Sequence, residues 1–131
     1  MGALKRGYKV ILVELWNFGE CGETKQGPDC YLSSMNALLL GRTTIGERVW
    51  DVQRMSDVME QYFPDLDLSH LTCLGLSGGC TATTYVSCLE PRIRYVVIAS
   101  AFCTFKHSIG AMYHCSCNAV PDIARYFTRQ N

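Results

Sequence analysis

The chain has 131 residues, of which 48% are hydrophobic and 18% charged, and its formal net charge is zero. This length supports one hydrophobic core and hence a single domain over residues 1–131. The balanced charge argues against binding to nucleic acid or an anionic membrane, and no apolar stretch approaches the ~20 residues that span a bilayer. Without a secretory leader pattern, we expect a soluble, cytoplasmic protein that acts on a small molecule or binds another protein.

The first predicted element is a buried strand over Tyr8–Leu15, because the run is apolar and rich in β-branched residues. Residues 17–29 contain several glycines and a proline, so they are predicted to form a loop. A helical pattern starts near Ser33 and is interrupted near Gly41.

The helical pattern resumes at Thr44, which has capping-box spacing with Glu47. This helix should end before Pro64, because a residue that precedes proline disfavours helical backbone. A second strand leads into Ser77, and a helix of about ten residues follows it and ends near Leu89.

A third strand is predicted at Tyr95–Ala99, whose apolar character is typical of a strand that is covered on both faces. Alternating strands and helices indicate parallel pairing, and the expected fold class is α/β with three α/β/α layers around a short parallel sheet. Residues 101–131 are rich in cysteine and are expected to form a lid-like or peripheral segment that ends in a short helix at Pro121–Phe127.

The most informative motif is Gly75-Leu76-Ser77-Gly78-Gly79, a G-x-S-x-G pattern between a predicted strand and a predicted helix. This context is typical of a nucleophile elbow, in which a tight turn presents the serine hydroxyl. We expect a Cβ at Gly75 or Gly79 to crowd the adjacent strand and helix. Ser77 is therefore the candidate nucleophile. The alternative is a glycine-rich turn in which Ser77 only caps the helix.

Several segments together resemble the α/β-hydrolase superfamily, in particular its acetyl-xylan-esterase-like and dienelactone-hydrolase-like members. These segments are Gly41-Arg42-Thr43, Gly46 to Asp51, Gly75 to Cys80, and His114-Cys115-Ser116-Cys117-Asn118 followed by Pro121. The resemblance covers nearly the whole chain and implies a central fragment of that fold. It implies hydrolysis of carboxylic esters through an acyl-enzyme on Ser77, with the Gly78 N–H as one oxyanion-hole donor and no cofactor.

Two residues depart from the pattern of such relatives. Cys80 stands where glycine is usual, and Glu14 stands where an aspartate is common. The triad acid and base that the resemblance implies, and the second oxyanion donor, are not found in this sequence. Without a base the serine hydroxyl is a weak nucleophile, so we expect little or no turnover by this chain. A prolyl-oligopeptidase-like peptidase and a non-catalytic fragment that binds or assembles are the alternatives.

The histidines of the chain offer candidate bases of lower rank. His70 precedes the strand that leads to Ser77, so it is expected at the wrong end of the sheet. His107 and His114 follow the third strand and would reach Ser77 only if the cysteine-rich segment folded over it. Asp51, on the helix that starts at Thr44, is better explained as a solvated carboxylate than as a catalytic acid.

The chain has eight cysteines, which are scattered rather than arranged as a disulfide framework, so free thiols are expected. Near the C-terminus the candidate zinc ligands are Cys103, His107, His114, Cys115 and Cys117. Their spacing differs from that of structural zinc sites, which favours buried thiols over a metal site. Cys80 could have a reactive thiol at a helix start, but packing is its expected role.

The resemblance also raises a question of strand order. It implies a further strand between Tyr8–Leu15 and the strand before Ser77, and this sequence does not supply it. Three outcomes follow: direct pairing into a three-stranded sheet, completion by a second copy or partner, or poor order around Tyr8–Leu15. We expect one of the first two, and the unpaired edges favour a homo-oligomer.

Overall fold

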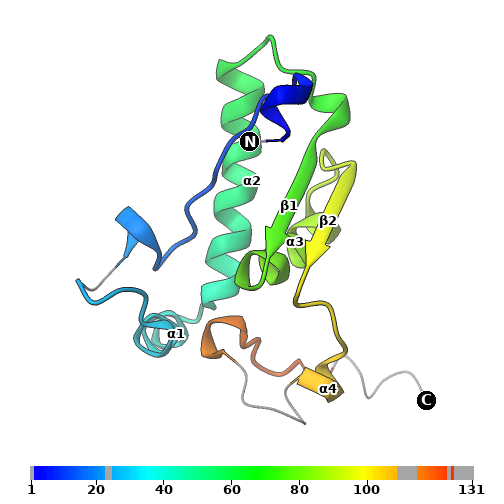
Figure 1. Cartoon of the computed structure of the whole chain (residues 1–131). Coiled ribbons are helices and arrows are strands. Elements are labelled where there is room, and N and C mark those ends of the chain that lie inside the picture. The colour runs from blue at the N-terminus through cyan, green and yellow to red at the C-terminus, as the bar shows by residue number, and fades with distance from the viewer. Residues whose placement is uncertain (1, 23–24, 109–114, 124, 126–131) are drawn as a thin grey trace.

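The computed structural model describes residues 2–22, 25–108, 115–123 and 125. Its helices and strands are α1 (Cys30–Leu39), α2 (Thr44–Tyr62), β1 (Thr72–Leu76), α3 (Gly78–Leu89), β2 (Tyr95–Ala99) and α4 (Phe105–Ser108). Short 3-10 helices occur at Leu4–Arg6, Gly19–Cys21, Leu68–His70 and Ser116–Asn118, the last of which is η4. The fold is mixed α/β, as the sequence predicts (Figure 1).

The sheet has two parallel strands, β1 and β2, with Thr72 opposite Tyr95 and Leu76 opposite Ala99. α3 connects the strands and packs against both of them. The predicted strand before Ser77, the helix that follows it and the strand Tyr95–Ala99 are therefore confirmed. Parallel strands need such a crossover, because a tight turn cannot return the chain to the same end of the sheet.

The N-cap residue of α2 lies one position earlier than predicted. Thr43 Oγ1 accepts a hydrogen bond from the Gly46 N–H at 3.0 Å, so Thr43 is the N-cap. Thr44 is instead buried, and its hydroxyl lies 3.3 Å from Ser34 Oγ. The prediction that this helix ends before Pro64 is confirmed, since its last residue is Tyr62.

α1 starts at Cys30, three residues before the predicted start near Ser33. The reason is a cap that the periodicity does not show: Asp29 Oδ1 accepts the Leu32 N–H at 2.8 Å. The helix ends at Leu39, and Gly41 takes a left-handed conformation with φ 71°, which ends the helical run where predicted.

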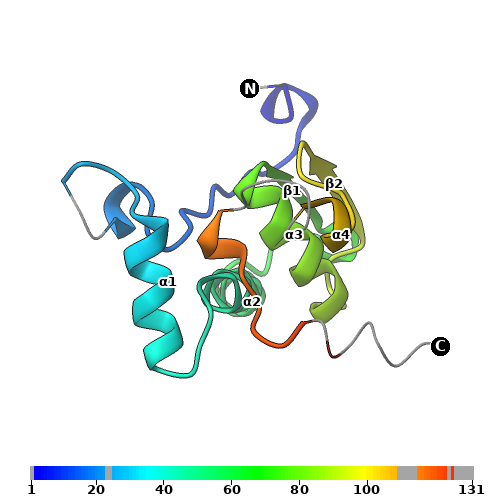
Figure 2. The same cartoon turned by 90° about the horizontal axis from the view of Figure 1, so that it is seen from below.

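The core of the molecule lies between α2, α3 and the segment that connects α3 to β2. Val49, Val86 and Ile93 form a buried cluster, against which Leu71 and Cys73 of the region around β1 pack. Figure 2 shows α3 beneath the two strands and α2 beneath α3, so both helices lie on one side of the sheet. Burial of these apolar side chains provides most of the stability of this unit.

An ionic network connects the end of α3 to α2. The Arg92 guanidinium donates hydrogen bonds to Glu90 Oε2 and Asp57 Oδ1, each at 2.6 Å, and to Glu60 Oε2 at 3.0 Å. Glu90 is buried. The hydrogen bond from the Arg92 side chain is the main cause that holds the pKa of Glu90 below its usual range.

The opposite face of the sheet is open. Leu74 and Leu76 of β1 are 69% and 65% exposed, and Tyr95 and Val97 of β2 also face solvent. The predicted three-layer arrangement is therefore not formed by the described residues, and the expectation that Tyr95–Ala99 is covered on both faces is wrong. The physical reason is that α2 and α3 both pack on the same side, so no helix remains for the second face.

The predicted strand over Tyr8–Leu15 is wrong, because this segment belongs to no sheet. It runs as a separate extended segment that pairs with neither strand (Figures 1 and 2), and its Leu12 side chain is 91% exposed. A strand needs the edge of another strand to satisfy its backbone groups, and direct pairing with β1, one of the two expected outcomes, does not occur. Within the segment Lys9 Nζ donates to the Asp65 carbonyl at 3.4 Å, and directly after it Arg48 donates to the Trp16 carbonyl.

The described part of residues 101–131 lies beyond the carboxyl ends of the strands, and η4 contacts α1 and α2 there (Figure 1). Of the predicted helix Pro121–Phe127, residues 121–123 form a turn and most of the rest lies outside the described residues. Across the part of the chain that the structure describes, no helix has the length and apolar character needed to cross a bilayer.

Candidate active site

Ser77 occupies the turn between β1 and α3 with a backbone conformation that side chains rarely adopt, φ 53° and ψ −117°. Such a conformation costs about 1–3 kcal/mol in a residue other than glycine, and it persists only where neighbouring contacts enforce it. Two hydrogen bonds do so here. The Ser77 N–H donates to the Ala99 carbonyl at 3.0 Å, and its own carbonyl accepts the Thr81 N–H at 3.2 Å. The side chain is exposed.

The glycines that flank Ser77 differ in what they require. A Cβ at Gly75 would overlap the Gly79 carbonyl group and Thr83 Oγ1, so the predicted crowding is confirmed there. A Cβ at Gly79 would meet no atom, so the same prediction is wrong for Gly79. β1 and α3 approach closely because Gly75 has no side chain, so the backbone of Gly79 can lie directly against it.

Gly78 is the first residue of α3, directly after Ser77. The first amide groups of a helix have no partner within the helix and carry a partial positive charge. An oxyanion that forms beside Ser77 would therefore find backbone donors at the start of α3. The second oxyanion donor that the resemblance implies has no counterpart identified among the described residues.

A groove of about 700 Å³ opens beside Ser77. One wall is formed by residues between Leu12 and Phe18, and the other by the end of β1 and the start of α3. The lining residues are Leu12, Val13, Glu14, Leu15, Phe18, Leu76, Ser77, Gly78 and Gly79. The lining is mostly apolar, with one carboxylate. That carboxylate, Glu14, accepts the Glu20 N–H at 3.0 Å.

No histidine hydrogen-bonds to Ser77 within the described ranges. His70 lies before β1 and is held by Asp67 Oδ2 at 2.8 Å. Because β1 lies between His70 and Ser77, the two residues are at opposite ends of a strand roughly 16 Å long, and the expectation that His70 lies at the wrong end of the sheet is confirmed. His107 Nδ1 lies 2.7 Å from Thr104 Oγ1 in its own turn. His114 lies outside the described residues.

Asp51 lies away from Ser77, in a separate cavity of about 280 Å³ that it shares with Trp16 and Glu47. Burial, and then the charge of Glu47, raise the pKa of Asp51 above its usual value. The carboxylate is thus less solvated than expected, but it does not line the groove of Ser77.

No protein-family model, curated protein or solved structure matches this chain.

The cysteines are all free, as expected. Cys80 is fully buried beside the turn, which agrees with the packing role predicted for it. Cys103 is exposed, and among the other candidate ligands that the structure describes only Cys115 and Cys117 are close together, with their Sγ atoms 3.0 Å apart.

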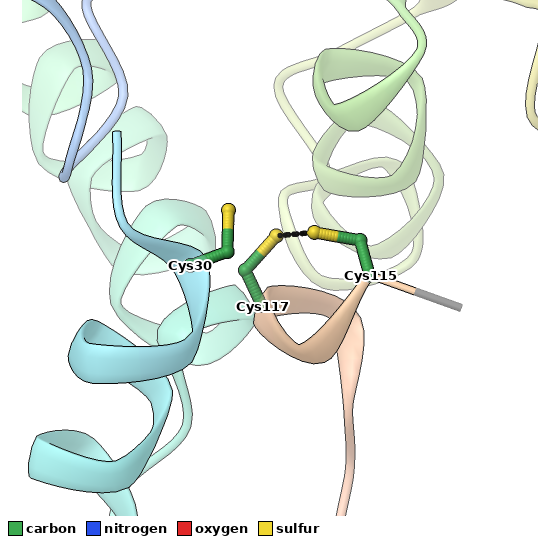
Figure 3. Close-up of side chains that lie close together, drawn as sticks. All are labelled: Cys30, Cys115 and Cys117. Atoms are coloured by element: carbon green, nitrogen blue, oxygen red, sulfur yellow. Dashed lines mark hydrogen bonds between the residues drawn. The ribbon is translucent and has the colours of Figure 1, made fainter. Parts of the chain in front are cut away.

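Sequence reasoning missed a third member of this group, Cys30 at the start of α1 (Figure 3). Burial raises the pKa of Cys117 to about 12. Burial also acts to raise the pKa of Cys115, but hydrogen bonds from Cys117 and Cys30 and the charge of Arg48 together lower it. No spacing signal connects Cys30 to the other two, because they come from segments that are far apart in the sequence.

Proposed function

We propose that this chain is a serine-dependent carboxylic-ester hydrolase of the acetyl-xylan-esterase-like type, on a truncated α/β-hydrolase fold. The observation that supports the proposal is the conformation of Ser77, an exposed residue other than glycine held at φ 53° where a parallel strand meets a helix. Strain of this kind is common at functional sites, where it is part of the pre-organisation of the site. A serine that only capped α3 would accept an amide hydrogen bond, and Ser77 makes no such cap.

In the proposed reaction, Ser77 Oγ attacks the ester carbonyl carbon and the Gly78 N–H stabilises the oxyanion. Collapse of this intermediate breaks the bond to the alcohol, which leaves with a proton and gives an acyl-enzyme on Ser77. Water then releases the carboxylic acid. The acyl group would lie along the apolar walls of the groove, which favour a small apolar acyl chain over a charged one.

The proton on Ser77 Oγ has no acceptor of the histidine type within the described residues. An unactivated hydroxyl attacks slowly, so the proposal includes weak turnover by this chain. The protein needs no cofactor for this chemistry. The free cysteines fit a reducing compartment, which supports the cytoplasmic location as part of the proposal.

Labelling by a fluorophosphonate tests the proposal, with Ser100 as the matched control. Ser100 directly follows β2 as Ser77 directly follows β1, it is exposed, and its φ is also positive at 66°. We expect slow labelling of the native chain, loss of labelling in Ser77→Ala and unchanged labelling in Ser100→Ala. Labelling that survives Ser77→Ala would show that this serine is not the nucleophile.

A prolyl-oligopeptidase-like peptidase would use the same serine and turn. The two activities are separated by the relative rates at which the native chain, once shown to react with the fluorophosphonate, hydrolyses an acetyl ester and a proline-containing amide. We expect hydrolysis of the ester only, because amide hydrolysis also needs protonation of the leaving nitrogen. The carboxyl group that lines the groove, Glu14, is engaged by the Glu20 N–H.

A second candidate function is assembly without catalysis, which the open sheet face favours. Leu74 and Val97 expose an apolar surface beside the unpaired edge of β1, and such edges pair with other chains. If this function is correct, sedimentation velocity will show a concentration-dependent homo-oligomer that Leu74→Lys weakens. Leu39→Lys, at an 85% exposed position of α1, is the control. An inert Ser77 together with a stable oligomer would favour assembly over hydrolysis.

A further inference from the structure

Three cysteine side chains converge at the end of the molecule where α1, α2 and η4 meet (Figure 3). Cys30 is the first residue of α1, Cys115 directly precedes η4, and Cys117 lies within η4. Their Sγ atoms all lie within 4.8 Å of one another. Two elements that are distant in the sequence thus bring their sulfur atoms to one point, and the contact of η4 with α1 and α2 holds them there.

The spacing of the sulfur atoms fits a single thiophilic ion. A zinc ion binds thiolate sulfur at about 2.3 Å, which places the sulfurs of a tetrahedral site roughly 3.8 Å apart. Closing the cluster around an ion would therefore need shifts of about 1 Å or less in the longer pairs, and a small opening of the Cys115 to Cys117 pair, now at 3.0 Å. Rotation about the side-chain bonds can supply shifts of this size.

The surroundings of the cluster favour a negatively charged complex. The Arg48 side chain is fully buried, and its positive charge acts on both Cys115 and Cys117. Its Nη1 group has no hydrogen-bond partner among the described residues. A buried and partly unpaired guanidinium is costly. Three thiolates and one divalent ion carry a net charge of −1, which would compensate this charge and accept the free N–H.

We propose that Cys30, Cys115 and Cys117 bind one Zn²⁺ ion through three thiolates, with a fourth position open to solvent. On binding, each thiol forms a sulfur–metal bond and releases its proton to water. Cys117 is buried while Cys115 is exposed, so one side of the ion faces the interior and the other faces solvent. Three protein ligands and an open position are the arrangement of zinc sites that accept water or a small anion.

The sequence spacing does not predict this site, because the candidate ligands near the C-terminus begin at Cys103 and do not include Cys30. Cys115 and Cys117 supply two of the three ligands, and the third comes from α1. The proposal does not depend on Ser77 or on ester hydrolysis.

Titration of the reduced, metal-free full chain with Cd²⁺ and Zn²⁺ tests the site. Cd²⁺ reports thiolate ligands through an ultraviolet charge-transfer band, and Zn²⁺ should displace it. We expect one equivalent to bind, and affinity to fall at least about tenfold in Cys30→Ser and in Cys117→Ser. The matched control is a chain in which the exposed cysteines outside the cluster, Cys21, Cys88 and Cys103, are all changed to serine, and it should bind as the native chain does.

A second measurement keeps the test valid if a variant folds poorly. Alkylation of the native chain, read by mass spectrometry, should show that Zn²⁺ protects Cys115 at least tenfold while the exposed Cys88 stays reactive. Binding that survives Cys30→Ser, or is lost in the control chain, would overturn the proposal. So would a reduced protein that takes up no ion and whose cluster cysteines only form a disulfide in air.

Discussion

The unit of β1, α3, β2 and α2 and the segment Tyr8–Leu15 each contain an apolar run that predicts a strand, but their structures differ. In the first, Val86 is fully buried; in the second, Leu12 is 91% exposed. The difference lies in partners. Each strand of the unit has a neighbouring strand and a helix across it, whereas no strand reaches the edge of Tyr8–Leu15. Apolar composition alone therefore does not make a strand.

The largest effect is expected where β1 and α3 approach most closely. Gly75→Ala should lower the free energy of unfolding by about 3 kcal/mol or more, because its Cβ overlaps backbone that cannot move without separating the two elements. Urea denaturation measures this change. Gly79→Ala is the control and should be neutral or stabilising by up to about 1 kcal/mol, since its Cβ meets nothing. Equal losses in both variants would contradict the difference between the two glycines.

A smaller effect is expected in the core of the same unit. Val86→Ala removes methyl groups from a side chain with no exposed surface, so we expect a loss of about 2 kcal/mol in the free energy of unfolding. The midpoint of thermal unfolding, followed by circular dichroism, gives an independent measure. A loss below about 0.5 kcal/mol would mean that this cluster does not form the core.

The ionic network at the end of α3 should make the unit sensitive to acid. Because Arg92 lowers the pKa of Glu90 in the folded chain, the carboxylate stabilises the fold above its unfolded pKa, and this stability is lost as the pH falls through the folded pKa. Glu90→Gln should cost about 1–2 kcal/mol at neutral pH and flatten the acid dependence of unfolding. Glu60 also pairs with Arg92, but its side chain is 66% exposed, so Glu60→Gln should cost less than about 0.5 kcal/mol.

The smallest effect is expected in Tyr8–Leu15. Leu12→Ser should change the free energy of unfolding by less than about 0.5 kcal/mol, because the side chain is already in water. Limited proteolysis should cut the native chain in this segment before it cuts α3 or β2. Protection of the segment at high protein concentration would instead indicate that a second copy covers it.

Prediction from sequence succeeded where the determining signals are local. The run into Ser77, the helix that follows and Tyr95–Ala99 are each specified by neighbouring residues, and they pair with one another. The caps were predicted less well, since Thr43 and Asp29 lie outside the apolar pattern that marks the helices. The strand at Tyr8–Leu15 failed because strand formation depends on a partner, which no local pattern reveals.

The candidate sites show the same division. The position of Ser77 on a strand-to-helix turn follows from a five-residue motif, and the structure adds its strained backbone. The grouping of Cys30 with Cys115 and Cys117 depends on how α1 packs against η4, which is a property of the folded chain. The open face of the sheet was not predicted for a related reason: the apolar sequence of a strand does not indicate which of its two faces a helix covers.

Arg48 supports two parts of the molecule at once. Its Nε and Nη2 atoms each donate to the Trp16 carbonyl at 3.2 Å, and its guanidinium lies 5.0 Å from the centre of the Phe18 ring, which lines the groove of Ser77. The same cation supplies the positive charge beside Cys115 and Cys117. The geometry of the groove wall and the electrostatic potential at the thiol cluster are thus tied to one side chain, so neither can be redesigned at this position without disturbing the other.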